Sequence, residues 1–127
     1  MEPKKILIAD DEKDLRDALR EALEGAGFSV LEAVDGEEAV SIALTERPDL
    51  ILLDIMMPKM NGHEALRAIR RNPWGKNAKV ISLTALDDAT SISNAVFLKT
   101  GEYIIKSSAS LADIVKKVKQ HLVGYTD

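Results

Sequence analysis

The feature that most constrains the fold of this sequence is a repeated alternation of short apolar runs with longer stretches of helical periodicity. Because the apolar runs are too short for helices, we interpret them as strands. Leu50–Leu53 has no polar position, as expected for a strand buried on both faces. The five predicted strands are Ile6–Ala9, Ser29–Ala33, Leu50–Leu53, Lys79–Thr84 and Glu102–Ile105.

Helical periodicity fills the segments between and after these runs. In the first segment, apolar residues recur every three or four positions, and Gly25 and Gly27 then end the helix. The other four helices are predicted from Asp35 through Arg47, from the loop at Gly62 to about Asn72, after Asp87 or Asp88, and after Ser110. Five strands alternating with five helices predict an α/β fold, a doubly wound and mostly parallel sheet covered on both faces.

Composition narrows the range of functions. A length of 127 residues fits one domain, which we expect to span 1–127 with a core from about 4 to 122. A net charge of −4 argues against direct nucleic-acid binding and against an anionic membrane surface. The apolar runs are too short to cross a bilayer, no secretion signal is visible, and cysteine is absent. These properties predict a cytoplasmic protein without disulfides or thiolate metal sites.

Chemically active side chains follow four of the predicted strands. Asp10 and Asp11 come after the first strand, Asp54 ends the third, Thr84 ends the fourth and Lys106 ends the fifth. In a parallel sheet these positions reach the same rim, where α/β proteins bind their ligands. The sequence therefore predicts a polar site built from four separate segments.

A simpler interpretation is that such aspartates only cap helices. It could account for Asp10 or Asp11, but it fits Asp54 poorly because Ile55–Pro58 does not begin a helix. Three nearby carboxylates repel one another unless a cation neutralises them, and Mg²⁺ prefers oxygen ligands. An ammonium and a hydroxyl could then contact phosphoryl oxygens, and a carboxylate can form an acyl phosphate.

The residues at this rim resemble those of bacterial two-component response-regulator receiver domains, the CheY-like family. The resemblance covers about Lys4 to Leu122, and its most specific part is the stretch Asp54-Ile55-Met56-Met57-Pro58-Lys59-Met60-Asn61-Gly62. Ile8–Glu12, Leu83–Ala85 and Tyr103–Lys106 match at the family's spacing. The resemblance implies the strand order 2-1-3-4-5, for which CheY is itself the standard example.

The resemblance also implies roles for individual residues. Asp54 matches the phospho-accepting aspartate. Asp11 and Asp54 match direct Mg²⁺ ligands, together with the backbone carbonyl of Met56, and Asp10 matches an acidic residue that often binds the metal through water. By the same resemblance the phosphoryl donor would be a histidine kinase or a histidine phosphotransfer protein. The chain would not be an enzyme acting on external substrates.

The resemblance further assigns the parts that respond to phosphorylation. Lys106 matches the lysine that pairs with the phosphoryl group, Thr84 the hydroxyl that moves onto it, and Tyr103 the aromatic that turns inward at the same time. This coupled motion would switch the affinity for a downstream protein. The surface expected to bind that protein is formed by the fourth helix, the fifth strand and the fifth helix.

The sequence departs from the family pattern at two places. Ser107 follows Lys106 where the family usually has proline, so we expect a trans peptide bond there. Lys99-Thr100 stands where the family usually has Gly-Ala, so the fourth helix would end differently. Met56 and Leu86 match positions that flank the route of attacking water, and because both are apolar we predict slow self-dephosphorylation.

Two other functions fit parts of the pattern. One is a phosphatase or phosphotransferase with an aspartyl phosphate, but haloacid-dehalogenase-like enzymes carry Asp-x-Asp after the first strand, whereas this chain has adjacent Asp10 and Asp11. The other is a degenerate receiver used only for docking. His63 and His121 are expected to be surface helix residues, and Trp74 is expected to anchor a loop.

Overall fold

The computed structural model describes residues 3–84, 102–106 and 109–122, and within them five strands form one parallel sheet. The strand order is β2-β1-β3-β4-β5, as the family resemblance implied. The strands are β1 (Lys5–Ala9), β2 (Ser29–Ala33), β3 (Leu50–Asp54), β4 (Val80–Thr84) and β5 (Glu102–Ile105). Each predicted strand therefore begins and ends within one residue of the observed strand.

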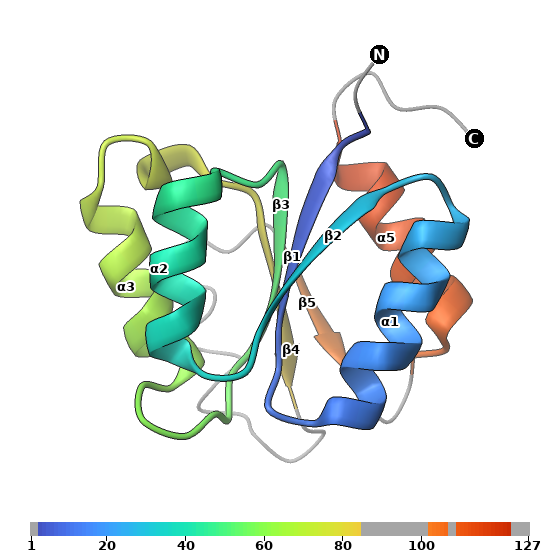
Figure 1. The fold of residues 1–127 in the computed structure, drawn as a ribbon, viewed down its shortest axis with the longest axis horizontal. Coiled ribbons are helices and arrows are strands. Elements are labelled where there is room, and N and C mark those ends of the chain that lie inside the picture. Colours follow the sequence, from blue (N-terminus) through green and yellow to red (C-terminus); the bar gives the residue numbers. More distant parts are fainter. Residues whose placement is uncertain (1–2, 85–101, 107–108, 123–127) are drawn as a thin grey trace.

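Helices cover both faces of this sheet (Figure 1). The helices α1 and α5 lie on one face, and α2 and α3 lie on the other. Their bounds are α1 (Lys13–Gly25), α2 (Gly36–Glu46), α3 (Gly62–Arg71) and α5 (Leu111–His121), and a short 3-10 turn, η1, covers Gly75–Asn77. The predicted fourth helix, with its caps at Asp87 or Asp88, lies outside the described residues.

Alternate residues of the central strands supply two separate cores. On the α1 and α5 side, Ile6, Ile8, Leu50 and Leu52 are fully buried against helix residues that include Leu19 and Val118. On the other side, Leu7, Ala9, Ile51 and Leu53 pack against α2 and α3. This arrangement explains why Leu50–Leu53 carries no polar residue: each of its two faces is a core.

The ends of the helices largely follow the capping signals. The Asp35 side chain accepts a hydrogen bond from the Glu38 N–H, and Ser110 and Asp113 form a complete capping box. α2 ends at Glu46, one residue earlier than predicted, because Arg47 adopts a left-handed conformation with φ of 48°. Leu111, the first residue of α5, is 39% exposed.

Trp74 packs against the core beneath α3, which confirms its predicted role as a loop anchor. His63 and His121 are half-buried rather than fully exposed, so the prediction of surface positions was only partly right. Among the described residues, no helix is long and apolar enough to cross a membrane.

Candidate functional site

The carboxyl ends of four strands bring the predicted site residues to one rim of the sheet. Asp10 follows β1 directly, Asp54 is the last residue of β3, Thr84 is the last residue of β4, and Lys106 follows β5. The register pairs Ala9 with Leu53 and Thr84 with Ile105, so these strand ends are level. Asp10, Asp54 and Thr84 are all buried, which is unusual for polar side chains without a specific role.

Asp10 is held by its backbone and by its side chain. Its N–H donates to the Ala33 carbonyl at 3.1 Å, and its Oδ1 accepts from the Glu12 N–H at 2.9 Å. Helix α1 takes Glu12, not an aspartate, as its N-cap, and no side chain caps it. The helix-capping interpretation of Asp10 and Asp11 is therefore wrong.

The two carboxylate oxygens of Asp54 differ in the contacts that they make. Its Oδ1 accepts from the Met56 N–H at 3.3 Å and lies 3.2 Å from Lys106 Nζ. Within the described residues, Oδ2 accepts no hydrogen bond, although the residue is only 3% exposed. One oxygen of Asp54 is therefore fixed, while the other accepts no hydrogen bond from the described residues.

Lys106 lies at the centre of the acidic cluster. Its Nζ is 3.0 Å from Asp10 Oδ2, 3.2 Å from Asp54 Oδ1 and 3.3 Å from Glu12 Oε1. Its N–H donates to the Thr84 carbonyl at 2.9 Å, which extends the β4–β5 ladder to this residue. The ion pairs thus connect the ends of β1, β3 and β5, as predicted for Asp10, Asp54 and Lys106.

Burial and charge perturb two of these groups in the metal-free protein. Burial, followed by the charge of Asp10, raises the pKa of Asp54 from its usual 3.8 to about 7, although Lys106 opposes the change. Burial alone would lower the pKa of Lys106, but the carboxylates of Asp54 and Asp10 outweigh it and raise that pKa to about 12. The negative charge of the carboxylates at this site is therefore only partly balanced by the ammonium of Lys106.

The donor set fits a hard divalent cation. Carboxylate oxygens of Asp10, Asp11 and Asp54 lie within 4.8 Å of one another. Asp10 Oδ2 is fully buried yet accepts no hydrogen bond from the described residues, and its partner is the ammonium of Lys106. Asp11 is exposed, so the cluster has one side open to solvent. Oxygen ligands with room for water are what Mg²⁺ requires.

The loop that follows Asp54 is held by two close backbone approaches. The Gly62 N–H donates to the Ile55 carbonyl at 2.9 Å, and a Cβ at Gly62 would overlap the Asp54 carbonyl oxygen. Two residues before Gly62, the Met60 carbonyl oxygen lies where a Cβ at Gly36 would overlap it. Both glycines therefore let backbone segments approach more closely than any other residue would permit.

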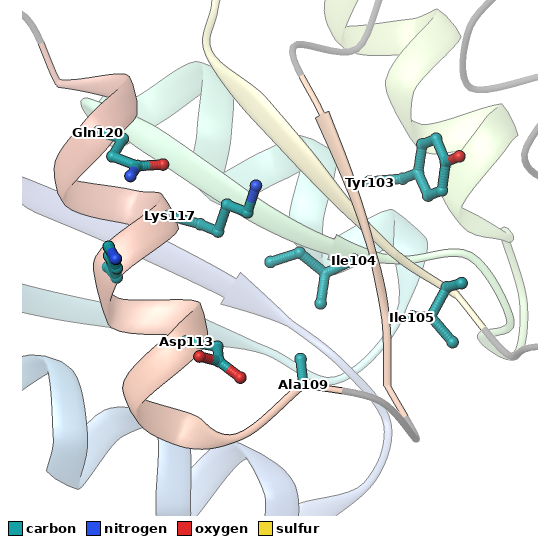
Figure 2. Close-up of a pocket in the computed structure, with 8 residues that line it drawn as sticks. Tyr103, Ile104, Ile105, Ala109, Asp113, Lys117 and Gln120 are labelled. Atoms are coloured by element: carbon teal, nitrogen blue, oxygen red, sulfur yellow. The ribbon is translucent and has the colours of Figure 1, made fainter.

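Tyr103 lies apart from the acidic cluster, on the outer strand β5. Its side chain is 39% exposed and lies on the side of β5 away from α5, whereas Ile104 points toward α5 (Figure 2). The two residues also line an open groove of about 450 Å³ between β5 and α5, which Lys117 and Gln120 border from the helix. The outward orientation is compatible with an aromatic side chain that could turn inward, but the motion stays a prediction.

Several predicted features cannot be compared with the structure, because Leu86, Lys99–Gly101 and Ser107 lie outside the described residues. Conversely, sequence reasoning missed Arg16, whose guanidinium contacts the Asp10 carbonyl, and Glu12, which pairs with Lys106. Both lie in or next to the first turn of an amphipathic helix. The only available signal was their proximity in sequence to Asp10 and Asp11.

Comparison with known proteins identifies the family. Residues 6–119 match the model of the response regulator receiver domain, so the chain belongs to this family. It is therefore a receiver domain of the two-component signalling type.

Relatives of known sequence agree with this assignment. The chain is 39% identical over 106 residues to a probable transcriptional regulator ycf27 of Porphyridium aerugineum, and the aligned region covers 84% of this chain and 43% of that protein. It is 39% identical over 103 residues to the alkaline phosphatase synthesis transcriptional regulatory protein PhoP of Bacillus subtilis, covering 81% and 42%. The chain thus spans about two-fifths of the length of these relatives.

Solved structures share the fold over nearly the whole chain. The chemotaxis protein CheY4 of Vibrio cholerae matches with a TM-score of 0.87 and 27% identity, covering 94% of this chain and 99% of that one. The receiver domain of a sensor histidine kinase from Pseudomonas aeruginosa, described with a magnesium ion coordinated in its active-site cleft, matches with a TM-score of 0.85 and 26% identity, covering 93% and 96%.

Proposed function

We propose that this receiver domain accepts a phosphoryl group on Asp54 from the phosphohistidine of a histidine kinase or phosphotransfer protein, in a Mg²⁺-dependent reaction. The observation that carries the proposal is the asymmetry of the Asp54 carboxylate. Its Oδ1 is held by the Met56 N–H and by Lys106, while Oδ2 accepts no hydrogen bond from the described residues. A nucleophile needs such an arrangement: a fixed orientation and one free oxygen.

In the proposed reaction, Asp54 Oδ2 attacks the phosphorus of the donor and the P–N bond to the histidine breaks. The electron pair of that bond leaves with the imidazole, and Asp54 becomes an acyl phosphate. Lys106 Nζ, 3.2 Å from Oδ1, is close enough to pair with a phosphoryl oxygen once the group is transferred. Asp10, Asp11, Asp54 and the Met56 carbonyl would hold the Mg²⁺, which would neutralise charge on the carboxylates and the phosphoryl oxygens.

The open side of the cluster supports access for a donor side chain, since Asp11 is exposed and the Met56 side chain is 66% exposed. Asp10 is a weaker candidate nucleophile: it is 0% exposed, and each of its oxygens already has a partner in Glu12 or Lys106. The difference in how the carboxylate oxygens are paired favours Asp54 as the acceptor.

We further propose that Thr84 and Tyr103 carry the response. Thr84 ends β4 level with Ile105, and Tyr103 lies two residues earlier on the neighbouring strand. A phosphoryl group that attracts the Thr84 hydroxyl would leave space at the end of β4 for the Tyr103 ring. The surface of β5 on the side away from α5 would then change shape, and with it the affinity for a downstream protein. In this proposal residues 1–127 act as one cytoplasmic receiver domain, without catalysis on external substrates.

Phosphorylation is tested by incubating the chain with Mg²⁺ and acetyl phosphate, then measuring the intact mass. We expect one added phosphoryl group per chain, lost in the Asp54→Asn variant and in EDTA. Asp49→Asn is the matched control: Asp49 precedes the same strand at the opposite end of the sheet and should leave labelling unchanged. Retained labelling in Asp54→Asn would refute the assignment of the acceptor.

The same experiment separates the competing functions. A docking-only receiver would bind no phosphoryl group at any Mg²⁺ concentration. A phosphatase would release phosphate from p-nitrophenyl phosphate with many turnovers per chain. Stoichiometric labelling without turnover, followed by slow loss of the label, is the result that the receiver proposal requires.

A further inference from the structure

A largely buried arginine, Arg16, lies outside the acidic cluster and contacts the backbone between two of the aspartates of that cluster. Arg16 is the fourth residue of α1, and its Nη1 donates to the Asp10 carbonyl at 2.9 Å. Its Nε donates to Glu32 Oε1 on strand β2 at 3.2 Å. The side chain is only 12% exposed, so this is not a loosely held surface ion pair.

The contacted carbonyl belongs to the peptide unit that joins Asp10 to Asp11. This unit is planar, so fixing its oxygen also fixes the direction of the Asp11 N–H and of the two flanking Cα atoms. Both aspartates joined by this unit contribute a carboxylate to the cluster. A hydrogen bond from Arg16 therefore orients both carboxylates through a single backbone group.

Strand β2 supports the same peptide segment from a second point. The Ala33 carbonyl accepts from the Asp10 N–H at 3.1 Å, and Glu32, the preceding residue of β2, anchors Arg16. Arg20, one helical turn further along α1, donates to the other oxygen of Glu32 at 2.7 Å. Glu32 is thus held by two arginines, of which Arg16 alone also contacts Asp10.

From these contacts we propose that Arg16 is a positioning residue for the metal-binding carboxylates, acting through the Asp10–Asp11 peptide and anchored by Glu32. The inference rests on the proposed function, because it concerns the affinity of the same site for Mg²⁺. Groups that hydrogen-bond to metal ligands, and do not contact the metal themselves, orient those ligands and so influence the affinity for the metal. Arg16 does this through the backbone, and it occupies no oxygen of either carboxylate.

The test compares Arg16→Met with Arg20→Met. Both substitutions remove one arginine from Glu32 and one positive charge from α1, but only the first releases the Asp10 carbonyl. Mg²⁺ is titrated into each metal-free protein, with the dissociation constant read from amide chemical shifts, and unfolding in urea is measured in parallel. We expect Arg16→Met to raise the Mg²⁺ dissociation constant about tenfold, and Arg20→Met to leave it within about twofold of the native value.

Equal Mg²⁺ affinities in Arg16→Met and Arg20→Met would overturn the inference and leave Arg16 a structural ion-pair residue. If Arg16→Met does not fold, Glu32→Gln decides, because it weakens the anchor of Arg16 and retains an acceptor. A few-fold rise in the dissociation constant supports the inference, and an unchanged constant overturns it. If the native chain itself fails to bind Mg²⁺, the proposed function fails, whereas the inference alone fails when native binding is normal and the variants match it.

Discussion

Replacing Asp54 with asparagine should stabilise the metal-free protein at neutral and alkaline pH. The residue is 3% exposed, and burial together with Asp10 raises its pKa from 3.8 to about 7. Between these two values the native state retains a proton that the unfolded chain loses. Stability contributed by this group is therefore full below about pH 4 and is lost as the pH rises toward 7.

The size of the effect follows from the same two values. A difference of about three pH units, at about 1.4 kcal/mol each, sets an upper limit of about 4 kcal/mol above pH 7. Local relaxation and water at the open side of the cluster reduce this, so we expect Asp54→Asn to be more stable than the native chain by about 1–3 kcal/mol at about pH 8. At about pH 4 the two proteins should differ little.

The assay is urea unfolding in EDTA, followed by the fluorescence of Trp74 and by circular dichroism. The free energy of unfolding is compared between the two proteins at each pH, so that titrating groups remote from Asp54 cancel. Glu21→Gln serves as a control, because Glu21 is an exposed residue of α1. A difference that is absent at about pH 8, or that does not grow between about pH 4 and pH 8, would refute the reasoning.

Three further predictions concern packing, charge and capping. Gly36→Ala should destabilise the protein by about 1–3 kcal/mol in urea unfolding, because the added Cβ would overlap the Met60 carbonyl oxygen. Gly25→Ala is the control: nothing lies within 4 Å of the added Cβ, so this variant should be neutral or stabilising. Lys106→Met should bind Mg²⁺ several-fold more tightly in calorimetry, because the ammonium of Lys106 competes with the ion for the carboxylates of Asp10 and Asp54. Phosphoryl labelling of this variant should fall. Weaker Mg²⁺ binding would contradict the prediction. Ser110→Ala should lower the free energy of unfolding by about 1 kcal/mol, because the Ser110 hydroxyl accepts a hydrogen bond from the Asp113 N–H. An unchanged free energy of unfolding would mean that this hydrogen bond does not stabilise the protein.

The sequence was sufficient to predict the sheet because its central strands have cores on both faces. Leu50–Leu53 has to be apolar throughout, and such a run bounded by Pro48 and Asp54 fits a buried parallel strand better than a helix. The strand ends then follow, and with them the rim that gathers Asp10, Asp54 and Lys106. The strand order came from the family resemblance, because periodicity does not contain it.

The remaining features depend on distances that sequence patterns do not encode. The pairing of Glu12 with Lys106 joins residues 94 positions apart, and it depends on how α1 leaves the sheet. The role of Gly36 depends on the backbone of Met60 in a different loop. Arg16 looked like an ordinary polar position of an amphipathic helix, and only the structure shows its contact with Asp10. Propensity and spacing describe neighbours along the chain, and these contacts are tertiary.

The ion pair between Lys106 and Asp10 has a further consequence for the dynamics of the sheet. It ties the end of β5, a strand hydrogen-bonded on one side in the described structure, to the end of β1, although β3 and β4 lie between them. Any ligand that draws Lys106 away from Asp10 therefore alters the local opening free energy of an edge strand without breaking a backbone hydrogen bond. Amide hydrogen exchange along β5 should thus report the occupancy of a site that lies beyond its end.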